Sequence, residues 1–372
     1  MIELKLPSMG SDMDEGKLLE WRVKPGDAVR KGDVVAVVDT TKAAVEVESW
    51  EAGTVHELRV PVGDTVPVGT VLALLLAPGE SAPAPGAAPR PAPAPAPARK
   101  AISPAARARA KELGIDAASV AGTGPQGAVT IDDVERAAAG ARAPDRAAEM
   151  RRAIAAAMGR SKREIPHYYL AETIPMARTA EWLAAQNAKR PVTERLLMGV
   201  LQLKAVALAL ARAPELNGFW KDGAFAASKP IHIGIAISIR EGGLIAPALH
   251  DVDRKTLAEL MRELTDLVAR ARAGSLRSSE MSDPTITVTN LGEAGVEAVH
   301  GVIYPPQVAL VGFGRLALRP WVVDGAVQAV PAVTASLAAD HRVSDGIRGA
   351  RFLTELSERL QQPEALDVGG AR

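Results

Sequence analysis

The sequence of 372 residues contains no cysteine. A disulfide scaffold, a thiolate zinc site and a cysteine nucleophile are therefore excluded, and any thiol chemistry must use sulfur that another molecule supplies. The 44 basic side chains balance the 44 acidic ones, so charge gives no basis for binding to nucleic acid or to an anionic membrane. Apolar runs stay far below the ~18 residues of a membrane-spanning helix. The opening MIELKLPSMG carries charges where a signal peptide needs an apolar run, so we expect a soluble, cytoplasmic chain.

An internal repeat is the most regular feature that the sequence does have. Residues 15–37 align with residues 52–74 without a gap, and the glycines of the two stretches coincide. Each copy has the pattern of short strands broken by glycine turns. Two such copies are expected to close a small β-sandwich around a quasi-twofold axis.

A lysine lies in the segment that links the two copies. This segment, VVAVVDTTKAAVEVES at residues 34–49, alternates in a way that predicts a two-stranded hairpin with Lys42 near its tip. Lys42 should then project from one extreme of the sandwich. A lysine on a turn is most often simply solvated, so the residues of the hairpin alone do not assign it a role.

Two stretches of alanine and proline interrupt the chain after the repeat. They cover residues 78–100 and 139–148. Such segments cannot bury a core, and in a polyproline-like state they extend by about 3.1 Å per residue. We interpret them as spacers between domains.

A short helical region is predicted between the two spacers. Within residues 102–137, Ser103 can cap a helix that begins with proline and stops at Gly114, and Thr130 or Asp132 can start a second helix. So short a stretch can form only a minimal core. Its arginines can equally be scattered charges on a solvated helix face.

The remaining residues, 149–372, alternate between helical and strand patterns. This predicts an α/β or α+β domain with a mixed sheet. The segments TERLLMGVLQLKAVALALARA and TLAELMRELTDLVARARA have helical spacing, whereas HIGIAISI, LIAPAL, TITVTNLG and VALVGFG have the composition of strands.

One histidine of this region has carboxylates on both sides. In DHRVSDG, His341 follows an apolar strand and precedes an amphipathic helix. Ser344 or Asp345 can cap that helix, and His341 can be an ordinary turn residue. A histidine between carboxylates at a strand end is also a plausible general base.

The other histidines show no spacing typical of metal ligands, so the sequence predicts no metal site. His232 alternates within a strand pattern and is more typical of a packed residue than of a reactive one. These histidines are His56, His167, His232, His250 and His300.

The first region resembles a lipoyl domain. Residues 1–77 have its repeat, and Lys42 in DTTKA stands where that family carries lipoate in amide linkage. Biotin carriers share the fold but have methionines on both sides of their lysine. Thr41 and Ala43 occupy those positions here and therefore favour lipoate.

The short helical region resembles the peripheral subunit-binding domain of 2-oxo acid dehydrogenase complexes. The likeness covers residues 101–138, including the loop GTGPQG. It implies that Arg107 and Lys111, on the first helix, contact acidic patches of partner enzymes. Ala128 stands where the family has a further basic residue, after the last glycine of the loop.

The third region resembles the acyltransferase component of the same complexes. DHRVSDG matches the signature DHRxxDG of that family, whose catalytic domain is α/β and similar to chloramphenicol acetyltransferase. The resemblance implies that His341 is the general base toward the coenzyme A thiol, that Asp345 shapes the histidine loop, and that the hydroxyl of Thr289 donates to the developing oxyanion. It also implies trimers, or multiples of trimers, with His341 and Thr289 contributed by different chains.

Together the three regions resemble a dihydrolipoamide acyltransferase. We expect transfer of an acyl group from lipoyl-lysine to coenzyme A, acetyl as in the pyruvate dehydrogenase type. A branched-chain acyl or succinyl transferase and a non-catalytic lipoyl-bearing scaffold are the alternatives. The implied partners are a 2-oxo acid decarboxylase and dihydrolipoamide dehydrogenase. A free-standing acyltransferase would have no use for the lipoyl arm.

Overall fold

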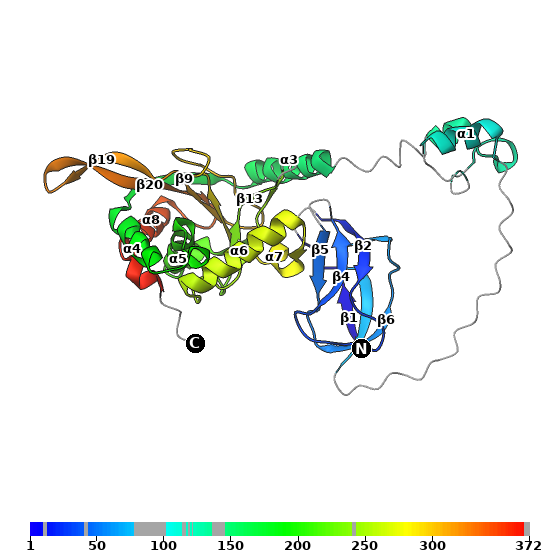
Figure 1. Cartoon of the computed structure of the whole chain (residues 1–372), viewed down its shortest axis with the longest axis horizontal. Coiled ribbons are helices and arrows are strands. Elements are labelled where there is room, and N and C mark those ends of the chain that lie inside the picture. Colours follow the sequence, from blue (N-terminus) through cyan, green and yellow to red (C-terminus); the bar gives the residue numbers. More distant parts are fainter. Residues whose placement is uncertain are drawn as a thin grey trace. The chain divides into compact units, whose positions relative to one another are not determined.

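The computed structural model describes residues 1–9, 13–40, 44–77, 102–113, 117, 120, 122–135, 146–239 and 243–367 (Figure 1). The chain divides into two units, one formed by Met1–Ser81 with Ala147–Arg372 and the other by Ala82–Arg146. No helix among the described residues is both long and apolar enough to cross a membrane.

The N-terminal residues form two antiparallel sheets around a shared apolar core. One sheet has the strand order β1–β8–β6–β3, and the other contains β5, β4, β2 and β7 in that order. The all-β sandwich predicted for this region is confirmed. The strands are β1 (Ile2–Lys5), β2 (Glu15–Trp21), β3 (Ala28–Val29), β4 (Val34–Asp39), β5 (Ala44–Glu48), β6 (Gly53–Leu58), β7 (Thr65–Pro67) and β8 (Val71–Leu76).

The internal repeat is visible in the strand pairing. Strands β2, β3 and β4 of the first copy correspond to β6, β7 and β8 of the second, and β2 pairs with β7 while β3 pairs with β6. Each copy therefore completes the sheet of the other. Matching turns use matching glycines at positive φ, 98° at Gly26 and 99° at Gly63, then 90° at Gly32 and 86° at Gly69. Glycine is the residue that adopts this conformation without strain.

The predicted hairpin between the copies consists of β4 and β5. Its register runs from Val34 opposite Glu48 to Asp39 opposite Ala44. Val45 and Val47 are fully buried, as their alternation indicated. Lys42 lies between the last paired residues in the sequence, outside the described residues.

In the second unit, helix α1 (Pro104–Leu113) begins where the sequence predicts. The Ser103 hydroxyl accepts from the backbone N–H of Ala106 at 3.1 Å, so the predicted cap is confirmed. Residues 131–135 are helical. The hydroxyl of Thr130 accepts from the N–H of Asp133 at 3.3 Å, so Thr130 and not Asp132 caps this second helix.

A buried carboxylate organises this small unit. Asp133, only 2% exposed, accepts from the backbone N–H and hydroxyl of Thr123 at 2.9 and 2.7 Å and from the same groups of Thr130 at 3.0 and 2.9 Å. The N–H of Thr123, followed by the other donors, holds the pKa of Asp133 well below its usual range. The apolar core that surrounds it is small: Ala106, Ala110, Ala117, Val120, Val129 and Val134.

The C-terminal region is built on a mixed sheet, as predicted. The strand order is β15–β12–β17–β18–β20–β19, with β9 also paired to β20. Parallel pairs β12–β17 and β17–β18 lie beside antiparallel ones. The strands are β9 (His167–Pro175), β10 (Gly218–Lys221), β11 (Ala224–Ala227), β12 (Ile233–Ile235), β13 (Ile237–Ser238), β14 (Leu244–Ile245), β15 (Ala248–Leu249), β16 (Leu276–Arg277), β17 (Ile286–Asn290), β18 (Ala309–Phe313), β19 (Ala317–Val323) and β20 (Ala326–Asp340).

Helices pack against this sheet, and α8 contacts both β9 and β20 (Figure 1). The most deeply buried helix is α5, which carries a lysine among its apolar residues. The ammonium group of Lys204 donates to the carbonyl oxygens of Asp253 and Lys255, each at 2.7 Å. The helices are α3 (Arg146–Glu164), α4 (Ala177–Ala188), α5 (Met198–Leu210), α6 (Leu257–Ala273), α7 (Ser278–Ser282) and α8 (Gly346–Leu360).

Strand β19 and the first half of β20 form a hairpin at the edge of the region (Figure 1). Val322 lies opposite Val327, and Leu318 follows on the same face because side chains alternate along a strand. Their exposed fractions are 68%, 73% and 72%. This hairpin face, Leu318 with Val322 and Val327, is therefore apolar and open to solvent in the single chain.

Candidate functional site

The loop that follows β20 is fastened by a buried ion pair. Asp340, fully buried at the end of the strand, accepts from the backbone N–H of Arg342 at 2.9 Å and from its guanidinium nitrogens at 2.9, 3.1 and 2.6 Å. The same guanidinium lies over the ring of Trp220, 4.5 Å from its centroid. The loop backbone is therefore fixed on both sides of the residue between them.

That residue is His341, and its side chain is exposed. Its backbone N–H donates to the carbonyl of Pro166 at 2.9 Å. Its ring meets the edge of Tyr168, with centroids 5.3 Å apart, and the Tyr168 hydroxyl bonds the hydroxyl of Ser344 at 2.8 Å. Among the described residues no side chain forms a hydrogen bond with the imidazole, so both ring nitrogens can reach a bound molecule.

Asp345 connects this loop to the next helix. Its carboxylate accepts from the backbone N–H of Arg348 at 3.0 Å and caps α8, as one of the two sequence interpretations held. The N–H of Arg348, followed by that of Ile347, lowers the pKa of Asp345, and the nearby His341 ring adds a small contribution in the same direction. Asp345 thus holds the end of the loop and adds negative charge near the imidazole.

Helix α8 also packs closely against β9, near the His341 loop. A Cβ at Gly349 would come within 2.8 Å of Leu170 and 3.0 Å of Tyr168. The first distance is shorter than real Cβ contacts and the second is tighter than most of them, so the glycine lets the helix pack closely against Leu170 and against Tyr168, whose ring touches His341. A larger residue there would press first on Leu170 and next on Leu337 and Tyr168.

Thr289 does not lie beside His341 within one chain. It pairs with Gly312 on β18, and Gly312 pairs with Ser336 on β20. At ~3.3 Å per residue along a strand and ~4.8 Å between strands, Asp340 lies roughly 16 Å from Thr289. A single chain cannot bring both side chains to one small reactive group.

The hydroxyl of Thr289 is nonetheless available. Thr289 is half-buried near the end of β17, and its hydroxyl has no hydrogen-bond partner among the described residues. By contrast Thr287, two residues earlier on the same face, is buried and donates to Gln307 at 2.7 Å. Among the described residues, the hydroxyl of Thr287 is therefore hydrogen-bonded, whereas that of Thr289 can still donate to a bound molecule.

The two residues predicted to bind partner enzymes lie in the second unit. Arg107 and Lys111 are both exposed, one turn apart on α1, and neither forms an ion pair with another described residue. Arg109 differs, because its guanidinium contacts Glu112 and Glu135, each at 3.0 Å. Arg109 is therefore occupied within the unit, whereas the other two cations have no ion-pair partner in the part of the chain that the structure describes.

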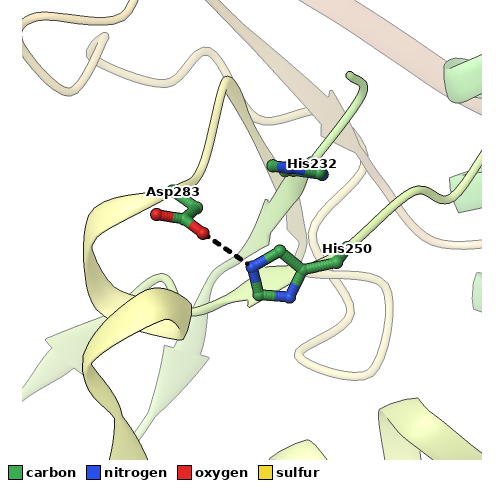
Figure 2. A group of neighbouring side chains, drawn as sticks. All are labelled: His232, His250 and Asp283. Atoms are coloured by element: carbon green, nitrogen blue, oxygen red, sulfur yellow. Dashed lines mark hydrogen bonds and ion pairs between the residues drawn. The ribbon is translucent and has the colours of Figure 1, made fainter. Parts of the chain in front are cut away.

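Three of the five histidines outside the loop have close polar neighbours. His167 is held between Ile165 and Ile303, so its environment is structural. His232 and His250 lie together and next to Asp283 (Figure 2), an arrangement that spacing in the sequence did not predict. The register of β12 with β15 brings the two histidines together, and their spacing in the sequence does not reveal this register.

Three family models match the chain. Residues 143–368 match the 2-oxoacid dehydrogenases acyltransferase catalytic domain, residues 101–135 match the e3 binding domain, and residues 2–75 match a biotin and lipoyl family described as biotin-requiring enzyme.

Curated relatives match over nearly the whole length. The chain is 30% identical to the dihydrolipoyllysine-residue acetyltransferase component of the pyruvate dehydrogenase complex of Zymomonas mobilis, over 97% of this chain and 98% of that protein. The corresponding protein of Rhizobium meliloti is 32% identical, over 99% and 100%.

Solved structures match the C-terminal region. A probable dihydrolipoamide acetyltransferase from Listeria monocytogenes superposes with a TM-score of 0.55 and 28% identity, covering 60% of this chain and 94% of that one. For the dihydrolipoamide acetyltransferase of Azotobacter vinelandii the TM-score is 0.56 and the identity 30%, covering 59% and 91%. The Azotobacter structure was studied for the roles of a serine, a histidine and an asparagine in catalysis.

Proposed function

Because the chain belongs to the 2-oxoacid dehydrogenase acyltransferase family, we propose that it transfers acetyl groups from lipoyl-lysine to coenzyme A in a pyruvate dehydrogenase complex. The curated relatives carry out this role by name. We assign the chemistry to His341, Thr289 and Asp345, and the lipoyl group to Lys42.

One observation carries the assignment of the residues. The spacing from Thr289 to His341 equals the spacing from the serine to the histidine of the Azotobacter enzyme, and the spacing from His341 to Asp345 equals that from its histidine to its asparagine. A hydroxyl, an imidazole and a short polar side chain thus recur in the same order. Asp345 replaces the asparagine while keeping a cap that either side chain can form.

His341 acts as the general base in this mechanism. Its exposed ring accepts the proton of the coenzyme A thiol, and the resulting thiolate attacks the carbonyl carbon of the thioester. After the carbon–sulfur bond to the departing thiol breaks, the imidazolium returns the proton to that sulfur. The ion pair of Asp340 and Arg342 fixes the backbone on both sides of His341 during both proton transfers.

Thr289 stabilises the charge that develops on the carbonyl oxygen. One donor aimed at such an oxygen contributes a few kcal/mol in a site that excludes water. The separation of roughly 16 Å within a chain means that the threonine facing a given His341 comes from a neighbouring copy. We therefore propose a trimer-based core with active sites between chains.

The apolar hairpin face of β19 and β20 supports such an assembly. Leu318, Val322 and Val327 are each more than two-thirds exposed in the single chain, which favours burial against another surface. A related structure is the cubic core of a pyruvate dehydrogenase complex. Replacing Leu318 and Val322 by aspartate should convert the assembly to smaller species, measured by analytical ultracentrifugation. Unchanged assembly would remove this hairpin from the interface.

When attached to Lys42, lipoate would supply the sulfur of the acyl thioester and a long arm that can carry the acyl group to the catalytic region. Lys42 stands between Asp39 and Ala44, the last paired residues of the β4–β5 hairpin, which suits a covalent arm. The proposed domain limits are 1–77, 101–138 and 149–372, and the spacers between them let the arm travel. Mass spectrometry of the chain should find the lipoyl mass on Lys42, and Lys42→Arg should abolish it.

The e3 binding region supplies the partner contact. We propose that Arg107 and Lys111 bind an acidic surface of dihydrolipoamide dehydrogenase, and that a 2-oxo acid decarboxylase delivers the acyl group. The double variant Arg107→Ala and Lys111→Ala should weaken dehydrogenase binding in calorimetry. Arg109→Gln is the matched control, because Arg109 contacts Glu112 and Glu135 instead.

The decisive experiment measures acyl transfer directly. Dihydrolipoamide is mixed with acetyl, isobutyryl or succinyl coenzyme A, and thioester formation is followed. We expect acetyl to be preferred, and His341→Ala to lose about 10²–10⁴-fold in rate, whereas the control His56→Ala, outside the catalytic region, keeps it. Preference for another acyl group would assign the chain to a related complex, and full activity of His341→Ala would disprove the mechanism.

A further inference from the structure

A second cluster of histidines lies away from the loop of His341. Strand β12 pairs antiparallel with β15, and Ile233 lies opposite Leu249. His232 precedes Ile233 and His250 follows Leu249, so the same register places the two histidines directly opposite each other on one face. From these positions we propose that His232, His250 and Asp283 form a binding site for a divalent transition-metal cation, with Zn²⁺ as the test ion.

The third ligand arrives from the other neighbour of β12. Strand β17 runs parallel to β12, with Ile286 beside Ile233. Asp283 stands just before β17, at the end of α7. The pairing of β12 with β15 and with β17 thus brings these three segments together.

The donor atoms already lie close to one another. One ligand atom from each residue can be chosen such that all three lie within 4.8 Å. His250 Nε2 and Asp283 Oδ2 are 3.0 Å apart, and the two imidazole centroids are 4.7 Å apart (Figure 2). Zinc with bonds of about 2.0–2.1 Å holds tetrahedral ligands about 3.3 Å apart. Small side-chain rotations therefore suffice to form the site.

The electrostatic state of the ligands suits a cation. Burial, followed by the neighbouring His250, lowers the pKa of His232, so this ring is neutral at pH 7. Burial would raise the pKa of Asp283, but hydrogen bonds from His250 and Ser282 outweigh it, and the net pKa is lowered. The site thus offers a neutral imidazole and an ionised carboxylate, the forms that bind metals.

A second carboxylate stands behind the first histidine. The backbone N–H of Asp251 donates to His232 Nδ1 at 3.1 Å, and an Asp251 carboxylate oxygen lies 3.8 Å from the same nitrogen. When a metal binds through Nε2, the proton of the neutral ring must move to Nδ1. The Asp251 carboxylate can then accept a hydrogen bond from Nδ1, in place of the bond from the backbone N–H, and orient the ligand imidazole. The exposed fractions of 14% for His232, 29% for His250 and 33% for Asp283 leave a route for the ion and for water.

The chemistry of the donors selects the metal. Two imidazoles and one carboxylate suit Zn²⁺ and its first-row neighbours, whereas Mg²⁺ and Ca²⁺ prefer oxygen alone. A bound ion would join β12, β15 and the segment before β17, the strand that carries Thr289 farther along. We expect it to brace the sheet rather than to take part in acyl transfer.

The test uses the full chain with any lipoyl group kept as its disulfide, because a free dithiol also binds zinc. Co²⁺ is titrated and followed by visible absorption, and Zn²⁺ is titrated in competition with a chromogenic chelator. We expect one ion per chain. His250→Gln and Asp283→Asn should each lower the affinity at least about tenfold, while His56→Gln, a histidine on β6, should leave it unchanged.

Two further measurements separate binding from damage to the fold. Zinc should raise the melting temperature of the wild type and leave that of Asp283→Asn unchanged, because only a native-state ligand stabilises. Lys42→Arg, which cannot carry lipoate, should bind as the wild type does. No saturable binding by the wild type, equal affinity in Asp283→Asn, or loss of binding in Lys42→Arg would each overturn the proposed site and leave His250 and Asp283 as a plain ion pair.

Discussion

Two buried carboxylates organise two regions of this chain by different means. Asp340 is 0% exposed and relies on one residue, Arg342, whose guanidinium neutralises it. Asp133 is 2% exposed and relies on Thr123 and Thr130, which offer two backbone N–H groups and two hydroxyls but no positive charge. A carboxylate with one ionic partner depends wholly on it, whereas a carboxylate with several neutral donors keeps most of them when one is lost.

The largest effect should follow from removing that single partner. Arg342→Met leaves Asp340 as an unpaired buried charge and also removes the contact with Trp220. We expect the free energy of unfolding of the catalytic region to fall by about 3–5 kcal/mol, measured by urea denaturation. Acyl transfer should fall as well, because His341 is the next residue along the loop.

The control for this variant is Arg348→Met. Arg348 also pairs with a carboxylate, that of Glu215, but its side chain is 55% exposed. Exposed pairs add little, so stability should stay nearly unchanged. Equal losses in the two variants would contradict the importance of burial.

A double variant sharpens the same point. Asp340→Asn removes the buried charge, so Asp340→Asn combined with Arg342→Met should be more stable than Arg342→Met alone, by about 1–3 kcal/mol. The double-mutant cycle in urea measures this difference. If the two changes simply add, the cost of the unpaired charge is not the cause.

In the small unit, a smaller effect is expected from one lost donor. Thr130→Val removes a hydroxyl from Asp133 and the cap of the second helix, which should cost about 0.5–2 kcal/mol. Thr123→Val removes only a hydroxyl and should cost less. Hydrogen exchange of peptides from residues 122–135 in the full chain measures both, and the reverse order would contradict the capping role.

The smallest effect should come from mild acid. The pKa of Asp133 is lowered in the folded state, so its stabilisation is complete above the unfolded value of about 3.9 and is lost as pH falls below it. After correction for the intrinsic pH dependence of amide exchange, the protection factors of residues 122–135 should therefore fall slightly near pH 4 and more at lower pH. In Asp133→Asn this contribution to the pH dependence should disappear.

The sequence correctly predicted the structural features that depend on local signals. The paired glycines marked the turns of the repeat, Ser103 marked the start of α1, and DHRVSDG marked the loop between β20 and α8. These features depend on residues close together in the chain, whose backbone preferences act locally. The comparisons then confirmed the acyltransferase family that those motifs resemble.

Features that depend on register were not predicted. The pairing of β9 along β20 and the facing of His232 with His250 follow from which strands meet, and local alternation does not encode that choice. The buried Lys204 was missed for the same reason, because its partners lie on a loop far along the sequence. The role of Thr289 came only from resemblance.

The exchange of strands between the two copies of the N-terminal repeat has a consequence for synthesis on the ribosome. Strand β1 pairs with β8, and Ile2 lies opposite Leu75. Strand β2 pairs with β7, which is synthesised later. Neither copy can close its own sheet, so a nascent chain that ends between the copies has exposed strand edges. The N-terminal sandwich can therefore complete both of its sheets only after β8 has left the exit tunnel.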